Sequence, residues 1–170
     1  VKQGLLKLPA YGLIGELVTV GIGLPDDLSA LEAVMTEVAD DMLVWGLLPE
    51  RPLEAHKGTF GKAMIVAGST NYVGAAYLAA ASAGRIGAGL VTMAAPAALH
   101  AILAQKLTEA THLPLPHDKG ALSSPGIPAL IEHLAGYASL LVGPGLGQAM
   151  ETLRFVRRLF GIGEMGEEYG

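Results

Sequence analysis

HKGTFGKAMIVAGSTNYVGAA, from His56 to Ala76, is the stretch of this sequence that decides the fold. It holds a short apolar run at 63–67, a glycine turn that begins at Gly68-Ser69, and the start of a long alanine-rich helix at Val73-Gly74. This order predicts a strand, a turn and a helix. Unpaired backbone N–H groups and the positive end of a helix dipole meet at such a turn, which favours an anion, above all a phosphate. The stretch therefore indicates an α/β domain that handles nucleotides.

Predicted strands and helices alternate along the rest of the chain. Strands are expected at residues 62–67, 90–94, 111–115 and 139–142, helices at 74–86, 96–107, 127–135 and 150–160, and a loop at 117–125. Alternation of this kind predicts a three-layer α/β fold, with a mostly parallel sheet and helices on both faces. The helix at 74–86 has small residues on nearly every face, so we expect it to be buried between layers, with Leu78 in the interior.

The sequence before this region is less regular. Weak apolar-polar alternation at 15–22 predicts one or two short strands within residues 1–25. Apolar residues at helical spacing predict one helix, or two short ones, over about 28–46. Pro49-Glu50-Arg51-Pro52 is a stiff connector and the best candidate for a linker.

Composition excludes several classes of function. The net charge is −5 and no stripe of Lys and Arg could neutralise phosphates, so no nucleic-acid partner is expected. Arg154 and Arg157-Arg158 are expected on the solvated face of a helix. The chain has no cysteine and no HxxxH or HExxH pair, so no metal ligand is assigned.

No membrane partner is expected either. The uncharged stretch from Ile86 to Leu99 is shorter than the ~18 residues of a membrane span and contains Pro96. The first residues do not have the pattern of a signal peptide. A cytoplasmic location is the simplest expectation.

Two glycine clusters carry the functional argument. Gly68-Ser69 followed by Gly74-Ala75-Ala76 is neither a Walker A loop nor a GxGxxG turn. The small residues Gly74 and Ala75 either serve the turn alone or leave room for a ligand against the helix start. Gly143-Pro144-Gly145-Leu146-Gly147 follows the last predicted strand, either as a flexible connection or as a second ligand-binding end. Because ligands bind beyond the carboxyl ends of parallel strands, both clusters together predict the two sides of one crevice.

Other polar residues can be interpreted either as surface residues or as functional groups. Lys57, next to Gly58, is either a surface lysine or a cation that faces a phosphate. His112, His117 and Asp118 could perform acid–base chemistry, but a proline-rich loop carries such residues for solvation as well.

These motifs resemble a known family. The stretch HKGTFGKAMIVAGSTNYVGAAYLAAASAGRIGAGLVTMAAP, followed by VGPGLG, is similar to the first half of the ADP/ATP-dependent NAD(P)H-hydrate dehydratases, which have a ribokinase-like fold. The resemblance covers residues 33–160. Residues 2–25 resemble the closing segment of an NAD(P)H-hydrate epimerase domain. The resemblance thus implies an epimerase-like segment at 1–25, a helical linker and lead-in at 26–55, and the first half of a dehydratase domain at 56–170.

The resemblance also implies a reaction and a site. The family uses ATP or ADP, with Mg²⁺, to dehydrate NAD(P)H hydrate back to NAD(P)H through a phosphorylated hydroxyl. By the resemblance, Ala75 or Ala76 and Gly145 would contact the hydrated dinucleotide. The substrate-binding candidates are therefore these residues together with Gly74 and Gly143 of the glycine clusters. The candidates for contact with nucleotide phosphates are Lys57, Gly58, Gly68 and Ser69.

One departure from the family is equally informative. The family's GGxGD motif, which carries the catalytic aspartate, does not occur in these 170 residues. We therefore assign no catalytic residue in this chain and expect that aspartate beyond Gly170. We interpret the chain as an internal part of a bifunctional repair enzyme that is inactive alone. The missing strands would leave an open sheet edge, which favours homo-oligomers or aggregation.

Two alternatives to the dehydratase stay open. One is a small-molecule kinase of the same fold, for which the glycine motifs would be shared scaffold. The other is a non-catalytic nucleotide-binding module, whose loops hold a dinucleotide without turning it over.

Overall fold

The computed structural model describes residues 3–25, 27–29 and 33–162. These residues form two compact units, one up to Glu50 and one from Arg51 onward. The division therefore falls after Glu50, within the predicted linker and lead-in at 26–55 and not at its end. The assignment of the first residues to an epimerase-like domain stays a prediction.

The first unit is mostly irregular. It contains the 3₁₀ helices η1 (Gln3–Leu6) and η2 (Ala10–Leu13) and the α-helix α2 (Asp41–Leu47). The predicted strands within 1–25 are wrong for the residues described, because residues 14–25 form neither helix nor strand and are almost all exposed. An alternating pattern makes a strand only where a neighbouring strand takes up its backbone N–H and C=O groups.

Ser29 is helical, and helix α2 confirms the end of the one helix, or two short ones, predicted over about 28–46. Asp40 caps α2, since its carboxylate accepts a hydrogen bond of 2.8 Å from the N–H of Leu43. Residues 34–40 are irregular, and residues 30–32 lie outside the described part of the chain. None of the residues of α2 is buried. Without a packed face, a helix is favoured only where a local cap supports it.

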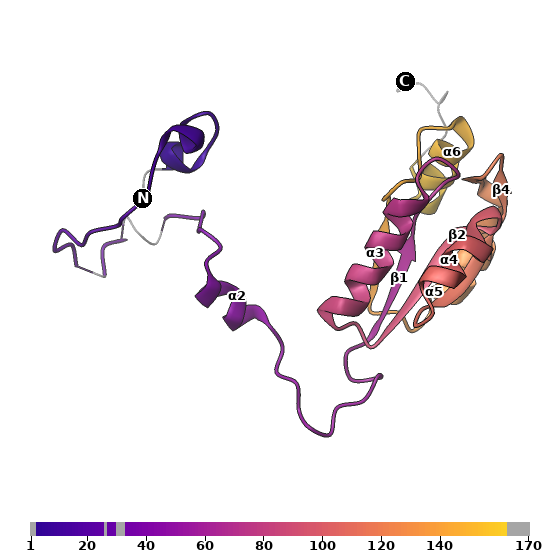
Figure 1. Cartoon of the computed structure of the whole chain (residues 1–170), viewed down its shortest axis with the longest axis horizontal. Coiled ribbons are helices and arrows are strands. Elements are labelled where there is room, and N and C mark those ends of the chain that lie inside the picture. The colour runs from indigo at the N-terminus through magenta and orange to yellow at the C-terminus, as the bar shows by residue number, and fades with distance from the viewer. Residues whose placement is uncertain (1–2, 26, 30–32, 163–170) are drawn as a thin grey trace. The chain divides into compact units, whose positions relative to one another are not determined.

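The second unit is built on a four-stranded parallel sheet (Figure 1). Its strands are β1 (Lys62–Val66), β2 (Leu90–Pro96), β3 (Thr111–Leu115) and β6 (Ser139–Val142), in the order β3-β2-β1-β6. Met64 lies opposite Thr92 of β2 and Leu140 of β6. The parallel arrangement predicted for the strands at 62–67, 90–94 and 139–142 is therefore confirmed.

Helices cover both faces of this sheet, as predicted. One face packs on α3 (Val73–Ile86) and α4 (His100–Lys106), the other on α5 (Ile127–Leu134) and α6 (Met150–Leu159). The first core contains Ile65, Ala67, Ala76, Ala80, Val91, Met93, Ala95, Leu99, Leu103 and Leu107. The second contains Met64, Val66, Ala94, Leu115, Leu122, Ile127, Leu130, Leu146 and Phe155. Successive residues of β1 alternate between the two cores, as the pleat of a strand requires.

The start of the helix predicted at 96–107 is wrong. Strand β2 continues through Pro96, which pairs with Leu115 of β3, and a 3₁₀ turn η3 (Ala97–Leu99) precedes α4. Pro96 has φ −48° and ψ 131°, an extended conformation in which a proline without N–H can end a strand.

The expected burial of α3 is also wrong in part. Only Ala76 and Ala80 of this helix are buried, and Leu78 is 62% exposed. The small residues let the helix lie close to the sheet on one side. Within the described residues of the second unit, Leu78 does not belong to the core cluster that contains Ala76 and Ala80, so it faces away from the sheet.

The predicted loop at 117–125 contains regular structure. Strands β4 (His117–Asp118) and β5 (Ala121–Leu122) form an antiparallel hairpin, and a 3₁₀ turn η4 (Ser124–Gly126) leads into α5. The two-residue turn Lys119-Gly120 joins the strands, and both residues have positive φ. A two-residue turn with this geometry matches the twist of a hairpin.

Strand β6 is the outer strand of the described sheet on its side. It pairs with β1 alone, and Leu140 and Leu141 are 37% and 43% exposed. An edge with exposed apolar residues agrees with the expectation that this side is open to further pairing.

Candidate functional site

A cleft lies at the carboxyl ends of β1 and β6. Its volume is about 830 Å³, within the ~300–1,000 Å³ typical of sites for small molecules and cofactors. Figure 1 shows the start of α3, the hairpin strand β4 and α6 at this same end of the second unit. The cleft is lined by Ser69, Thr70, Asn71, Tyr72, Ala75, Asp118, Lys119, Gly120, Ala121, Gly143, Gly145, Leu146, Gly147, Gln148 and Ala149.

The first wall is the turn between β1 and α3. Gly68 has φ +89°, and a Cβ atom there would lie 2.9 Å from the Cβ of Ala76. Only glycine therefore permits this turn to pass so closely over the helix. The N–H of Tyr72 donates to the carbonyl oxygen of Ser69 over 2.9 Å, which closes the turn just before the helix begins.

The second wall is the loop between β6 and α6. The N–H of Gly68 donates to the carbonyl oxygen of Pro144 over 2.8 Å, and the hydroxyl of Ser69 donates to that of Gly145 over 2.8 Å. Gly145 has φ +69°, and a Cβ there would lie 2.8 Å from the Cβ atoms of Ala75 and Tyr72. The two glycine clusters thus meet across one crevice, as the sequence predicted.

The β4–β5 hairpin forms a third wall, which the sequence analysis missed. The N–H of Thr70 donates to the carbonyl oxygen of Gly120 over 3.0 Å, so the hairpin tip is attached to the first wall. A signal for it exists in the sequence, because a two-residue turn that ends in glycine, between short flanking segments, is typical of a hairpin.

The starts of two helices lie at the cleft. Neither α3 nor α6 has a side-chain cap, and their starts carry Ala75 on one side and Gln148 and Ala149 on the other. Uncapped first-turn N–H groups and the positive ends of the helix dipoles favour an anionic ligand. Among the described residues that line the cleft, Asp118 and Lys119 carry the formal charges.

Four of the nine residues predicted for the site line the cleft. These are Ser69, Ala75, Gly143 and Gly145. Gly68 underlies the first wall through its hydrogen bond to the second. Ala76 is buried in the core with no exposed surface. Gly74 is exposed at the start of α3 but is not among the lining residues, and a Cβ atom on it would meet nothing within 4 Å.

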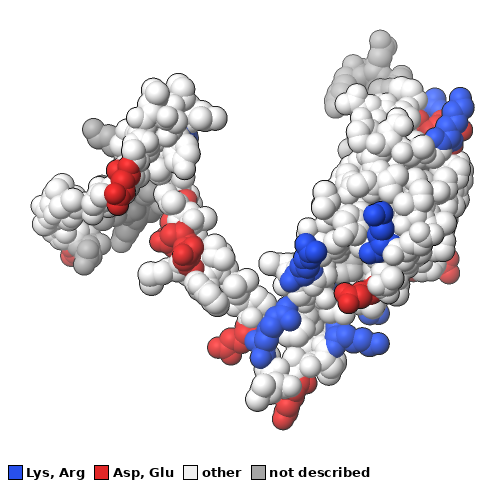
Figure 2. Space-filling model, viewed as in Figure 1, with Lys and Arg blue, Asp and Glu red and all other residues white. Residues whose placement is uncertain are grey.

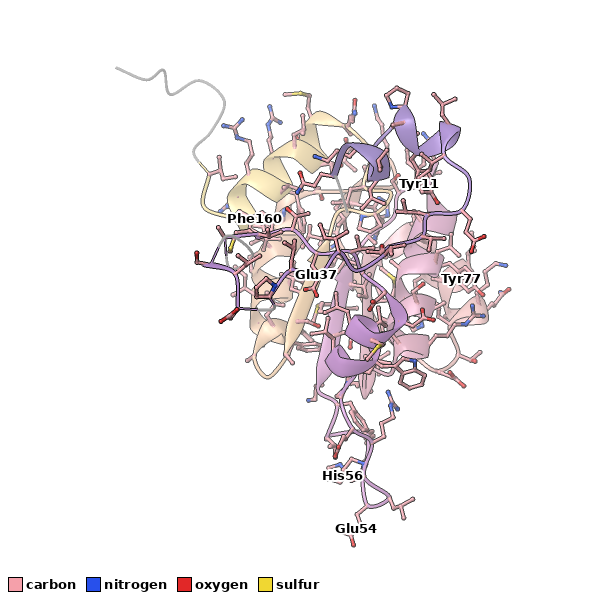
Figure 3. All side chains as sticks on the ribbon, turned by 90° about the vertical axis from the view of Figure 1, so that its left-hand side faces the viewer. Tyr11, Glu37, Glu54, His56, Tyr77 and Phe160 are labelled. Carbon is pink, nitrogen blue, oxygen red and sulfur yellow. The ribbon has the colours of Figure 1, made fainter. Side chains whose placement is uncertain are left out.

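Lys57 and Gly58 are not brought to the cleft. The carbonyl oxygen of Lys57 lies beside Gly89, just before β2 begins, and therefore at the amino ends of the parallel strands. Figure 3 shows their neighbour His56 at the end of the unit from which β1 starts. A phosphate contact from these two residues would lie at the opposite end of the sheet from the cleft.

The catalytic aspartate expected beyond Gly170 has no counterpart in the described structure. Gly170 itself, with the rest of residues 163–170, lies outside the described part of the chain. The structure therefore does not test where that aspartate lies, and its position stays a prediction.

The histidines do not form an acid–base group with Asp118. The Nε2 atom of His112 lies 3.2 Å from the carbonyl oxygen of Leu107, and its ring packs edge-on against His100. The Nδ1 atom of His117 accepts a hydrogen bond of 3.2 Å from the N–H of Gly120, which supports the hairpin turn. Of these three residues only Asp118 lines the cleft.

The described residues contain neither a cluster of metal ligands nor a helix that could span a membrane. Within residues 3–25, 27–29 and 33–162, no group of three or more His, Asp or Glu could hold a metal ion. No helix in the described part of the chain is long and apolar enough to cross a membrane. Figure 2 shows Lys and Arg of the second unit as separate groups on the visible face, with Asp and Glu among them. Arg154 is exposed and pairs with Glu151, as a solvated helix face predicts.

Known proteins share this fold. The structure resembles a ribokinase-like superfamily protein of Enterococcus faecalis, with a TM-score of 0.56 and 21% identity over 69% of this chain and 38% of that chain. It also resembles the ADP/ATP-dependent NAD(P)H-hydrate dehydratase of Bacillus subtilis, which was co-crystallised with ATP and Mg²⁺. There the TM-score is 0.56 and the identity 30%, over 71% of this chain and 40% of that chain. The predicted ribokinase-like fold is confirmed.

The sequence comparisons agree with the fold. The bifunctional NAD(P)H-hydrate repair enzyme Nnr of Moorella thermoacetica is 38% identical over 159 residues, which are 93% of this chain. The matched region spans 30% of the length of that relative. The family described as NAD(P)H-hydrate dehydratase matches residues 63–160, which include every strand of the sheet except the first residue of β1. The chain belongs to the NAD(P)H-hydrate dehydratase family.

Proposed function

We propose that the cleft binds the hydrated dinucleotide of NAD(P)H hydrate. The observation that carries the proposal is the junction of the two glycine turns, where Ser69 and Gly145 meet at the start of α3. Backbone N–H groups and two helix starts face a space large enough for a nucleotide. This arrangement suits the pyrophosphate of a dinucleotide, because the ligand replaces the missing helix caps.

Within this site, the dinucleotide lies against Ala75 of the first wall and Gly145 of the second wall. Gly143 has φ +138° and no atom within 4 Å of the position that a Cβ would take, so the ligand can approach its backbone. Ser69 holds the two turns together. Gly74 acts only through the backbone of the helix start, and Ala76 supports that start from the core.

The parent reaction is proposed from the relatives. In this proposal the protein takes part in the ADP- or ATP-dependent dehydration of NAD(P)H hydrate to NAD(P)H. In the same proposal, the protein also carries an NAD(P)H-hydrate epimerase activity. The bifunctional character of the Nnr relatives supports this. The described residues do not fit a metal site held by the protein, since Asp118 is the single carboxylate at the cleft. Mg²⁺ would be bound chiefly by the phosphates of the nucleotide, as is usual for this ion.

We propose that these 170 residues bind NAD(P)H hydrate but do not convert it to NAD(P)H. They contain no GGxGD motif, which in this family carries the catalytic aspartate. Binding alone stabilises ground state and transition state alike and does not speed the chemical step. The same observation favours a second candidate, a non-catalytic nucleotide-binding module.

Two measurements on residues 1–170 test the proposal. Titration calorimetry with NADH hydrate is expected to give saturable binding, and the absence of binding would contradict the proposed site. The return of NADH absorbance from the hydrate, with ATP or ADP and Mg²⁺ present, is expected to stay at the rate without protein. Turnover that depends on the nucleotide would place catalytic groups within these residues.

A further inference from the structure

One positively charged side chain lines the described part of the cleft. Lys119 is the one lysine or arginine among the described residues that line it. Its side chain is exposed and makes no hydrogen bond or ion pair within the part of the chain that the structure describes. The neighbouring carboxylate of Asp118 does not neutralise it through a salt bridge. The ammonium group of Lys119 is therefore available to a ligand.

The backbone of Lys119 is held in an unusual conformation. Its φ of 47° makes it the one non-glycine residue with positive φ in the described ranges. Residues other than Gly, Asn and Asp rarely adopt this conformation, and the first position of such a hairpin turn normally carries one of those three. The hairpin itself gives no reason for a lysine here, whereas a ligand with negative charge does.

The tip of the hairpin is also fixed in place. The carbonyl oxygen of Gly120 accepts the N–H of Thr70 over 3.0 Å, and the N–H of Gly120 donates to Nδ1 of His117 over 3.2 Å. A Cβ on Gly120 would lie 1.7 Å from Oγ1 of Thr70, so the turn is in close contact with the first wall. The base of the Lys119 side chain is thereby anchored beside the start of α3.

The charges of the cleft point to the group that Lys119 binds. The starts of α3 and α6 supply positive potential from two walls, and Lys119 adds a full positive charge from the third. Three converging sources of positive potential suit a phosphate, which forms strong charge-assisted hydrogen bonds with lysine and with backbone N–H groups.

We propose that Lys119 binds a phosphate group of the hydrated dinucleotide and so determines the preference of the cleft for phosphorylated ligands. This inference rests on the proposed function of the same cleft. The phosphate is either the pyrophosphate, which NADH hydrate and NADPH hydrate share, or the additional phosphate of NADPH hydrate. The two sources predict different effects of the same substitution.

Calorimetric titration of residues 1–170 with both hydrates tests the inference. Lys119→Gln removes the charge, and loss of one charge-assisted hydrogen bond lowers affinity roughly tenfold. Equal losses for both hydrates identify the pyrophosphate as the partner. A loss for NADPH hydrate alone identifies its additional phosphate. Lys106→Gln is the matched control, since Lys106 lies on α4 over the ring of Tyr77 and outside the cleft.

Two further readouts separate binding from a structural role. Lys119→Gly suits the positive φ better, so it should melt at the same temperature as the parent or higher while its affinity still falls. The affinity of the parent should also decrease more steeply with salt than that of Lys119→Gln. Unchanged affinity of both Lys119 variants, with normal binding by the parent, would overturn this inference alone. Absence of binding by the parent would instead contradict the proposed function.

Discussion

The hydroxyl of Ser69 donates a hydrogen bond of 2.8 Å to the main-chain carbonyl oxygen of Gly145, which lies 76 residues further along the chain. Ser69 is buried although it lines the cleft, so most of its surface is covered by protein. This hydrogen bond joins the turn after β1 to the loop after β6, beside the bond from the N–H of Gly68 to Pro144. The Ser69 side chain therefore helps the backbone bond of Gly68 to hold the two walls of the cleft together.

Ser69→Ala should reduce both stability and binding. The substitution leaves the carbonyl oxygen of Gly145 without its partner, which costs about 1–3 kcal/mol in the free energy of unfolding. The second wall is then less firmly held, so the affinity for NADH hydrate should fall as well. Urea unfolding and calorimetric titration measure the two effects. Ser82→Ala, on the exposed side of α3, is the control. Parent-like behaviour of Ser69→Ala in both assays would show that the bond does not support the cleft.

Gly145→Ala should destabilise the protein in two ways, through strain in the backbone and through a steric clash of the added methyl group. Alanine at φ +69° costs about 1–2 kcal/mol, and its methyl group would lie 2.8 Å from Ala75 and Tyr72. Gly136→Ala is a matched control, because Gly136 has φ +83° and no neighbour within 4 Å of the added Cβ. Overpacking should therefore make Gly145→Ala about 1–3 kcal/mol less stable than Gly136→Ala in urea unfolding. Equal losses would mean that the second wall can move away from α3.

Ala75→Leu should weaken binding, and it should also cost some stability, because the Cβ of Ala75 packs against Gly145. Ala75 is half-buried at the cleft, and a branched side chain there would extend into the space proposed for the dinucleotide. The affinity for NADH hydrate should fall roughly tenfold or more, because the ligand would clash with the leucine. Ser82→Leu, on the exposed side of the same helix, should bind as the parent does. Titration calorimetry and thermal melting distinguish the two effects, and unchanged affinity of Ala75→Leu would remove Ala75 from the site.

Leu78→Asp should have little effect on folding, contrary to what the sequence suggested. Because Leu78 is 62% exposed, the change should lower the free energy of unfolding by less than about 1 kcal/mol. Ala80→Asp, on the same helix but buried, should cost at least about 3 kcal/mol, since it buries a charge without a partner. If both variants unfold at similar urea concentrations, another part of the protein covers the outer side of α3.

The sheet and the two glycine walls could be predicted from the sequence for a physical reason. Strands β1, β2 and β6 are mostly apolar runs that lead into glycine or proline, and helices α5 and α6 have an apolar spacing of their own. These signals are local, so residues 62–67 and 139–142 were found within a residue of the observed strands. The rule that ligands bind at the carboxyl ends of parallel strands then brought Gly68 and Gly145 to one crevice.

The remaining features depend on contacts that no local pattern reveals. The hairpin wall was missed because its strands have two residues each and are held by the bond from Thr70 to Gly120. Leu78 was misplaced because the number of layers above a helix is a tertiary property. Lys57 belongs to a motif of the family but precedes β1, and it therefore lies at the amino ends of the strands, opposite the cleft.

The central claim is that the hydrated dinucleotide binds between the two glycine turns, and chemical-shift mapping tests it most directly. ¹⁵N-labelled protein would be titrated with NADH hydrate while the backbone amide signals are followed. The account predicts saturable shifts at residues 69–75, 118–121 and 143–149, with Lys57 and Gly58 unaffected. Shifts concentrated around Lys57 and Gly58, or no saturable shifts at all, would contradict it.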